Sequence, residues 1–232
     1  MKKLSVILAV YNEAGNIAPL VRSIRNVISS TDELIVVDDA STDTTAQEID
    51  PALAILVRHP VNRGKGAAIR TGIGAASGEL VLLMDGDGQD DPQDIPQVVN
   101  PVRAGKADFA IGSRFLNPGQ NSFVTPINRL GNRCLTSLVN FFLGVRITDS
   151  QAAFKCIRME ALKDIHLESD RYEVETEMLI KAVDKKLKIV EVPVHRYSRK
   201  YGKSHLYQIP FGRFKFGLRI MRVFIKSHFQ WR

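Results

Sequence analysis

Two aspartates separated by one glycine, Asp85 and Asp87, form the segment of this sequence best suited to chemistry. They follow an apolar run and would stand on a tight turn, where both carboxylates can share one hard divalent cation. Mg²⁺ and Mn²⁺ favour carboxylate and water oxygens, with phosphate oxygens completing the shell. Gln89 could add a carbonyl oxygen or hold a bound water. The alternative is a capped, solvated turn, because Asp and Gly are ordinary turn residues.

Three further polar segments each follow an apolar run, at 11–13, 38–43 and 62–66. The adjacent Asp38 and Asp39 could accept a hydrogen bond from a nucleobase N–H. They could equally cap the next helix, as could Ser41 and Asp43. The Gly64-Lys65-Gly66 triplet is similar to a phosphate-binding loop but lacks P-loop spacing, and a plain helix start explains it as well.

The elements that must position these segments are strands and helices in alternation. Near-continuous apolar runs predict strands at 4–10, 33–37, 53–57 and 79–84, with a fifth at 109–111. Such runs are typical of parallel strands covered on both faces. Helix-like spacing at 17–24 and 64–76 between the strands predicts a doubly wound α/β layer, and beyond about residue 105 the pattern loosens, with an amphipathic stretch at 127–143. Ligands bind beyond the carboxyl ends of such strands, so the polar segments should meet at one edge.

Composition limits the class of protein. The 232 residues are 44% hydrophobic and 25% charged, which excludes fibrous and disordered classes. Two cysteines cannot form a disulfide scaffold and favour a reducing, cytoplasmic setting. No uninterrupted apolar run reaches the roughly 18–20 residues that span a bilayer. The run at 4–10 is interpreted as a strand, not a signal peptide, because polar residues interrupt it and no cleavage site follows.

The net charge of +7 is unevenly distributed. Residues 195–232 hold ten Lys and Arg and no Asp or Glu, whereas the other 194 residues hold 22 basic and 25 acidic side chains. A helix over 211–229 would place Lys215, Arg219, Arg222 and Lys226 within about 60° of one another beside a wide apolar face. Trp231 would anchor it.

We therefore expect a domain at 1–207 and a basic amphipathic membrane-interface helix at 208–232; the alternative is a terminal helix packed on the core. A nucleic-acid partner is not expected, because base reading would not need so apolar a helix.

Taken in order, the motifs resemble those of family 2 glycosyltransferases of the GT-A fold. The segments that carry the resemblance are 10–13, 37–43, 62–68 and 85–92. Downstream segments are similar to the polyprenyl-phosphate glycosyltransferases, especially the dolichol-phosphate mannose synthases; they are 112–114, 149–155, 192–194 and 199–204. The resemblance covers roughly residues 4–207.

The resemblance implies a GT-A (Rossmann-like) α/β fold, with a mixed, mostly parallel sheet flanked by helices. It also implies an inverting, Mg²⁺- or Mn²⁺-dependent transfer of a sugar from a GDP-mannose or UDP-glucose type of donor to a polyprenyl or dolichyl phosphate. The protein would then be peripheral on the cytosolic face of a membrane, and a small membrane protein is a possible partner. Two alternatives stay open: a family 2 transferase acting on a sugar hydroxyl or other acceptor, and a non-catalytic regulator that binds nucleotide sugar.

The resemblance also assigns residues to roles. Positions around the base and ribose are Ala9, Tyr11, Glu13, Val37 and Asp39. The diphosphate set is Asp85, Gly86, Asp87 and Gln89, of which Asp85, Asp87 and Gln89 would hold the metal. Phosphate-binding positions are Arg114, Arg199 and His205, with Arg129 and Asn132 near the acceptor phosphate. Asp87, Arg114 and Arg199 would be catalytic. Ala9 replaces the usual proline, and His205 replaces the usual lysine, so a fixed charge there becomes dependent on pH.

The nature of the acceptor decides whether a general base is needed. A lipid phosphate is ionised near neutral pH and needs none, whereas a sugar hydroxyl would need a placed carboxylate. Asp149 and Glu175 are the two candidates for that base. We expect instead that Asp149 orients a loop, and that Glu173, Glu175 and Glu177 form a solvated helix start.

Overall fold

The computed structural model describes residues 3–116, 126–202, 219, 220 and 223. One sheet of seven strands has the order β3-β2-β1-β4-β6-β5-β7. The strands are β1 (Leu4–Val10), β2 (Glu33–Asp38), β3 (Ile55–Arg58), β4 (Leu80–Asp85), β5 (Phe109–Ser113), β6 (Lys155–Arg158) and β7 (Ile189–Pro193). Only β6 is antiparallel to its neighbours, so the predicted mixed, mostly parallel sheet is confirmed.

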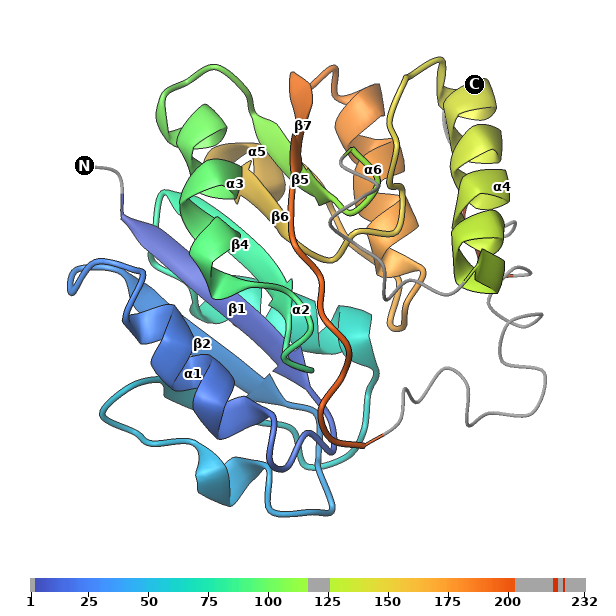
Figure 1. Cartoon of the computed structure of the whole chain (residues 1–232). Coiled ribbons are helices and arrows are strands. Elements are labelled where there is room, and N and C mark those ends of the chain that lie inside the picture. Colours follow the sequence, from blue (N-terminus) through green and yellow to red (C-terminus); the bar gives the residue numbers. More distant parts are fainter. Residues whose placement is uncertain (1–2, 117–125, 203–218, 221–222, 224–232) are drawn as a thin grey trace.

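Helices cover both faces of the sheet (Figure 1). Helices α1 (Ile17–Arg25) and α3 (Ile95–Arg103) pack on one face, and α2 (Lys65–Ala75), α5 (Met159–Lys163) and α6 (Val174–Asp184) on the other. Two short 3₁₀ helices, η1 (Ala46–Glu48) and η2 (Pro92–Asp94), complete this part of the chain. Side chains of β1 alternate between the two cores: Val6 and Leu8 join the first, and Ile7 joins the second.

The third strand differs from the prediction. It begins at Ile55 instead of residue 53, and it is an edge strand that pairs only with β2. Ile55 is 49% exposed, so the apolar run there does not mark a strand covered on both faces. Strands β2 and β4 each extend one residue beyond the prediction, which places Asp38 and Asp85 at their carboxyl ends.

Register brings the polar segments to one edge of the sheet. Asp38 pairs with Val10, and Asp85 pairs with Ala9, so the ends of three neighbouring strands are level. After β7 the chain returns across this edge, and Tyr197 N donates to Gln89 O at 2.7 Å. A second, distant part of the sequence therefore lies directly against the segment that follows β4.

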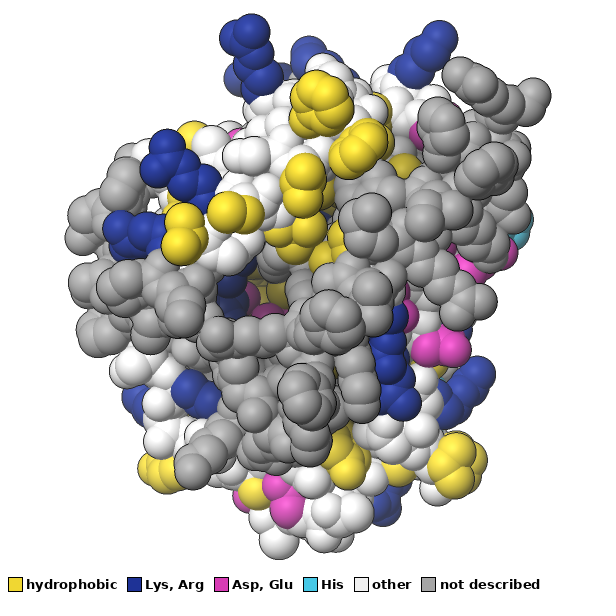
Figure 2. Space-filling model, turned by 90° about the vertical axis from the view of Figure 1, so that its right-hand side faces the viewer, with side chains coloured by type: hydrophobic (Ala, Val, Ile, Leu, Met, Phe, Trp, Pro, Cys, Tyr) yellow, Lys and Arg dark blue, Asp and Glu magenta, His cyan; other side chains and the backbone are white. Residues whose placement is uncertain are grey.

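Helix α4 (Pro126–Leu143) lies at the side of the molecule (Figures 1 and 2). It packs through buried Val139 and through Thr136 Oγ1, which is 2.9 Å from Ser150 Oγ. The predicted helix at 208–232 and His205 fall almost wholly outside the described residues. Within the described part of the chain, no helix is both long enough and apolar enough to cross a bilayer.

Candidate active site

The turn after β4 carries Asp85 and Asp87, the two aspartates predicted to share a divalent cation. We call residues 85–91 the acid loop. Gly86 is required there, because a Cβ at this position would collide with the Val10 side chain of β1. The loop is closed by Gln89 N, which donates to Asp87 Oδ1 at 3.1 Å. The absence of a side chain at Gly86 thus lets the loop fold down onto the end of the sheet.

Arg196 lies at the centre of the acid loop. Its Nη2 is 3.7 Å from Asp85 Oδ2 and 3.6 Å from Asp87 Oδ2. The same nitrogen donates to Gln89 Oε1 at 3.0 Å. Nη1 donates to Asp90 Oδ1 at 2.8 Å. The three side chains expected to hold a metal therefore surround one cationic nitrogen. Sequence reasoning missed Arg196, although its basic segment and the acidic remainder of the chain are complementary in charge.

Burial and opposite charges set the pKa values in this cluster. Burial alone would raise the pKa of Asp85, but Lys65 and Arg196 lower it to about 2. Burial raises the pKa of Asp87 above its usual value, although Arg196 opposes the shift. Burial also raises the pKa of Asp90 to about 6. Three carboxylates thus crowd one region, and their ionisation depends on the cations beside them.

Arg199 joins the acid loop to the segment after β1. It pairs with Glu13 and lies with Nη1 3.7 Å from Asp87 Oδ2. Burial raises the pKa of Glu13 even though Arg199 stabilises its charge. Asn16 Nδ2 donates to Glu13 Oε2 at 3.0 Å and to Tyr201 O at 3.1 Å, which fixes both sides of the contact. Two predicted residues, Glu13 and Arg199, are therefore direct neighbours.

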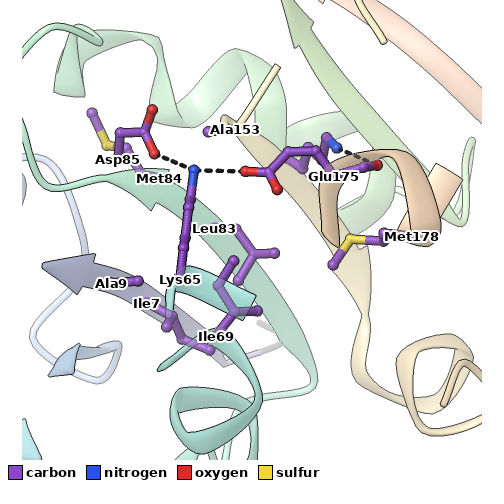
Figure 3. A pocket seen from close by; sticks show the side chains of 11 residues that line it. Ile7, Ala9, Lys65, Ile69, Leu83, Met84, Asp85, Ala153, Glu175 and Met178 are labelled. Carbon is purple, nitrogen blue, oxygen red and sulfur yellow. Dashed lines mark hydrogen bonds and ion pairs between the residues drawn. The ribbon is translucent and has the colours of Figure 1, made fainter. Parts of the chain in front are cut away.

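Lys65 is held between two carboxylates. Its Nζ lies 2.6 Å from Asp85 Oδ1 and 2.6 Å from Glu175 Oε1 (Figure 3). These carboxylates raise the pKa of Lys65 against the opposing effect of burial. The Gly64-Lys65-Gly66 triplet does begin a helix, α2, and Lys65 also holds an aspartate of the acid loop. The predicted solvated helix start at 173–177 is wrong for Glu175 and Glu177, which are both buried because each pairs with an ammonium group.

A second lysine, Lys155 on β6, lines a pocket together with Lys65, Asp85 and Glu175 (Figure 3). Its Nζ donates to Glu175 O at 3.2 Å, and burial lowers its pKa to about 8 despite the nearby Glu175 carboxylate. The folded protein therefore binds fewer protons than the unfolded chain between about pH 8 and pH 10.5, the usual pKa of a lysine side chain. Stability contributed by this group must rise with pH through that window.

This shift gives a prediction for pH-dependent stability. We expect the free energy of unfolding of the parent to rise by up to about 3 kcal/mol relative to Lys155→Met between those two pH values. Urea unfolding of both proteins at several pH values measures the difference. A difference that does not change with pH would contradict the lowered pKa.

The segment after β2 holds the candidate for base recognition, Asp39. Its carboxylate accepts hydrogen bonds from His59 Nδ1 at 2.7 Å, Arg63 N at 2.8 Å and Gly64 N at 2.7 Å. These contacts fix the side chain and use three of about four acceptor positions of a carboxylate. The alternative that Ser41 or Asp43 caps the next helix is not observed, because the element that follows is the 3₁₀ helix η1 and it has no side-chain cap. Ser41 Oγ and Thr45 Oγ1 instead accept from the backbone N–H groups of the 11–13 segment.

Ala9, Tyr11 and Val37 lie at the same edge of the sheet. Ala9 is half-buried in β1 beside the pocket of Figure 3, and Val37 is buried in β2. Tyr11 is half-buried in the segment that follows β1. The structure therefore places the residues expected around a base and ribose next to those expected around a diphosphate.

Arg114 and Asp149 form an ion pair joined by two side-chain hydrogen bonds. Arg114 Nε donates to Asp149 Oδ2 at 2.6 Å, and Nη2 donates to Oδ1 at 2.8 Å. The Asp149 charge raises the pKa of Arg114, and Arg114 lowers the pKa of fully buried Asp149. Asn132 Nδ2 on α4 lies 3.4 Å from Asp149 Oδ1, whereas Arg129 is exposed one turn earlier. Asp149 thus orients a cationic side chain and an amide.

The donor atoms at the acid loop suit a hard divalent cation. Asp85, Asp87 and Gln89 each place one side-chain oxygen near the same atom, Arg196 Nη2. Carboxylate and amide oxygens are the ligands that Mg²⁺ and Mn²⁺ take. In residues 3–116 and 126–202, no three His, Cys, Asp or Glu side chains form a metal-binding cluster. A metal here would need oxygens from water or from a ligand to complete its shell.

Comparison with known proteins identifies what this chain is similar to. A sequence model described as "Glycosyl transferase family 2" matches residues 5–166. The UDP-N-acetylglucosamine–dolichyl-phosphate N-acetylglucosaminyltransferase of Methanococcus voltae is 29% identical, and the match covers 96% of each chain. The undecaprenyl-phosphate mannosyltransferase of Micrococcus luteus is 32% identical, and the match covers 88% of this chain and 87% of that protein.

A solved structure has the same fold. It is glucosyl-3-phosphoglycerate synthase from Mycobacterium tuberculosis in complex with Mn²⁺, UDP and glucosyl-3-phosphoglycerate. The TM-score is 0.76 at 22% sequence identity, and the match covers 97% of this chain and 80% of that one. The similarity extends over nearly the whole chain.

Proposed function

Because the chain belongs to glycosyl transferase family 2, we propose that this glycosyltransferase moves a sugar from a nucleoside diphosphate sugar to a polyprenyl phosphate. The observation that carries the proposal is the grouping of Asp85 and Asp87 with cationic Arg196 and Arg199 at one edge of the sheet. Such a site can bind a cation and diphosphate oxygens together. The two relatives described above are named for lipid-phosphate acceptors, which supports the same choice.

Donor binding in this proposal uses the edge of the sheet. Asp39 has one acceptor position left for a base N–H, and its fixed orientation would favour one base edge. Ala9, Tyr11, Glu13 and Val37 would lie around the base and ribose. Asp85, Asp87 and Gln89 would hold Mg²⁺ or Mn²⁺, and a structural neighbour holds Mn²⁺ with UDP. When bound, such an ion would offset negative charge on the leaving diphosphate.

Sugar transfer then needs two anions brought together. A phosphate oxygen of the acceptor attacks the anomeric carbon with inversion, and the bond from that carbon to the diphosphate oxygen breaks, so the electron pair leaves with the nucleoside diphosphate. Arg114 and Arg199 have forked donors that suit phosphate, and Arg129, Asn132 and His205 would lie near the acceptor. Arg114 is held for this role by Asp149.

The carboxylates that could act as a base for a hydroxyl acceptor are already paired. Asp149 is bound to Arg114, which lowers its pKa and makes it a weak base. Glu175 is bound to Lys65. Neither carboxylate is therefore well suited to remove a proton from a hydroxyl nucleophile, whereas an ionised phosphate needs no base. We propose that residues 1–207 form the transferase and that 208–232 help it bind peripherally to the cytosolic face of a membrane, alone or with a small membrane protein.

The test is a transfer assay with purified protein and radiolabelled GDP-mannose, UDP-glucose or UDP-N-acetylglucosamine. We expect label to enter the organic phase only when Mn²⁺ or Mg²⁺ and a polyprenyl phosphate are both present. Transfer to a sugar hydroxyl without the lipid would instead indicate a different acceptor. Donor binding without any transfer would indicate a regulator.

A further inference from the structure

The carboxylate of Glu175, in the first turn of α6, is buried with one partner among the described residues. Its Oε1 lies 2.6 Å from Lys65 Nζ, and its Oε2 is buried without a hydrogen bond in the described part of the chain. A buried carboxylate with an unsatisfied oxygen costs free energy. The residue is therefore better explained by a role in the site than by a contribution to the stability of the fold.

The surroundings of Glu175 hold its ion pair in one arrangement. Lys155 Nζ on β6 donates to Glu175 O at 3.2 Å, which fixes the start of α6 beside the pocket. Apolar side chains of β1, β4 and α6 line the same pocket, among them Ile7, Leu83 and Met178 (Figure 3). Because charges interact more strongly in such surroundings than in water, the contact between Glu175 and Lys65 restricts both side chains.

Lys65 carries this restriction to the acid loop. Its Nζ also lies 2.6 Å from Asp85 Oδ1, so one ammonium group links the two carboxylates. The other oxygen, Asp85 Oδ2, lies 3.7 Å from Arg196 Nη2, on the side where the proposed cation would bind. The two oxygens of Asp85 therefore have separate partners. A lysine side chain is long and flexible, and a carboxylate on each side of its ammonium group limits that flexibility.

We propose that Glu175 is a positioning residue for cation binding: it holds Lys65 so that Lys65 fixes Asp85 Oδ1 and leaves Oδ2 to face the cation. The inference rests on the proposed function, because it needs Asp85 and Asp87 to hold Mg²⁺ or Mn²⁺. Glu175 also balances charge. Its carboxylate shares the positive charge of Lys65, which would otherwise act on Asp85 alone and oppose the binding of a divalent cation there.

The experiment measures Mn²⁺ binding to the full-length protein without donor or acceptor, from the electron paramagnetic resonance signal of free Mn²⁺. Glu175→Gln keeps the shape of the side chain and removes its charge. We expect the Mn²⁺ dissociation constant of this variant to rise at least about fivefold, because Asp85 alone then opposes the charge of Lys65. Glu177→Gln is the matched control and should bind Mn²⁺ like the parent, since Glu177 is buried on the same helix but pairs with Lys181 at 2.7 Å.

A second variant separates position from charge. Glu175→Asp keeps the carboxylate but is one methylene too short to reach Lys65 from the same backbone position. It should also bind Mn²⁺ more weakly than the parent. Binding equal to that of the parent would mean that the charge alone matters, and it would overturn the positioning role.

A double-variant cycle tests whether the effect passes through Lys65. In a Lys65→Met background, Glu175→Gln should change the Mn²⁺ dissociation constant by less than about twofold, because the ammonium group on which Glu175 acts is absent. An equal effect in both backgrounds, or binding by Glu175→Gln equal to that of the parent, would overturn the inference and leave the proposed function intact. A parent that does not bind Mn²⁺ would instead refute the metal site of the proposed function, and the inference with it.

Discussion

The Asp87→Asn variant is expected to transfer sugar at least about a thousandfold more slowly than the parent at a fixed metal concentration. The reason is that Asp85 and Asp87 each place a carboxylate oxygen close to Arg196 Nη2, at 3.7 Å and 3.6 Å, where the proposed cation would bind. Asparagine keeps the shape but loses the charge that binds a hard cation. A loss of several kcal/mol in stabilisation of the leaving group corresponds to this factor.

Loss of activity in this variant should not reflect unfolding. Burial raises the pKa of Asp87, so the folded protein already spends free energy to keep this carboxylate charged. The neutral amide removes that cost, and the melting temperature should stay close to that of the parent. The matched control is Asp91→Asn on the same loop, whose side chain accepts from Gln93 N and Tyr197 OH. Equal transfer rates for Asp87→Asn and the parent would refute the metal assignment.

The fold was largely predictable because its sheet is built from buried runs. Strands β1, β2 and β4 are covered by helices on both faces, so their sequences are apolar throughout and stand out from the polar segments between them. Strand β3 was predicted less well. An edge strand needs fewer buried residues than a central strand. The apolar run at 53–57 therefore predicts neither the start of β3 at Ile55 nor the exposure of its side chains.

Parts of the site depend on contacts between distant residues, which local patterns do not contain. The acid loop is visible as Asp85-Gly86-Asp87, but its counter-ion Arg196 lies more than a hundred residues later. The sequence alone predicts that the basic charge after residue 195 belongs to a membrane-binding tail. In the structure, Arg196 and Arg199 at its start pair with Asp90 and Glu13 instead. Similarly, the sequence predicts that Glu175 is exposed to solvent, whereas in the structure α6 places its carboxylate against Lys65.

The pairing of Arg196 leads to the second large expected effect. Arg196→Met leaves Asp85, Asp87 and Asp90 in one buried region without their shared cation. Removing one partner of a buried ion pair costs about 3–5 kcal/mol, and three carboxylates would repel one another here. We expect a loss of stability in this range when no divalent cation is present, measured by urea unfolding.

Divalent cations should reverse much of that loss. In the parent, Arg196 Nη2 already lies beside the oxygens of Asp85, Asp87 and Gln89, so an added cation must compete with a guanidinium for them. In Arg196→Met the cation becomes the main source of positive charge, and Mn²⁺ should stabilise the variant more than the parent. The control is Arg158→Met, which breaks a 2.5 Å pair with Asp108 away from the acid loop. If Mn²⁺ stabilised both variants equally, the oxygens around Arg196 would not be the cation site, and the arginine would serve only to hold the loop against the segment after β7.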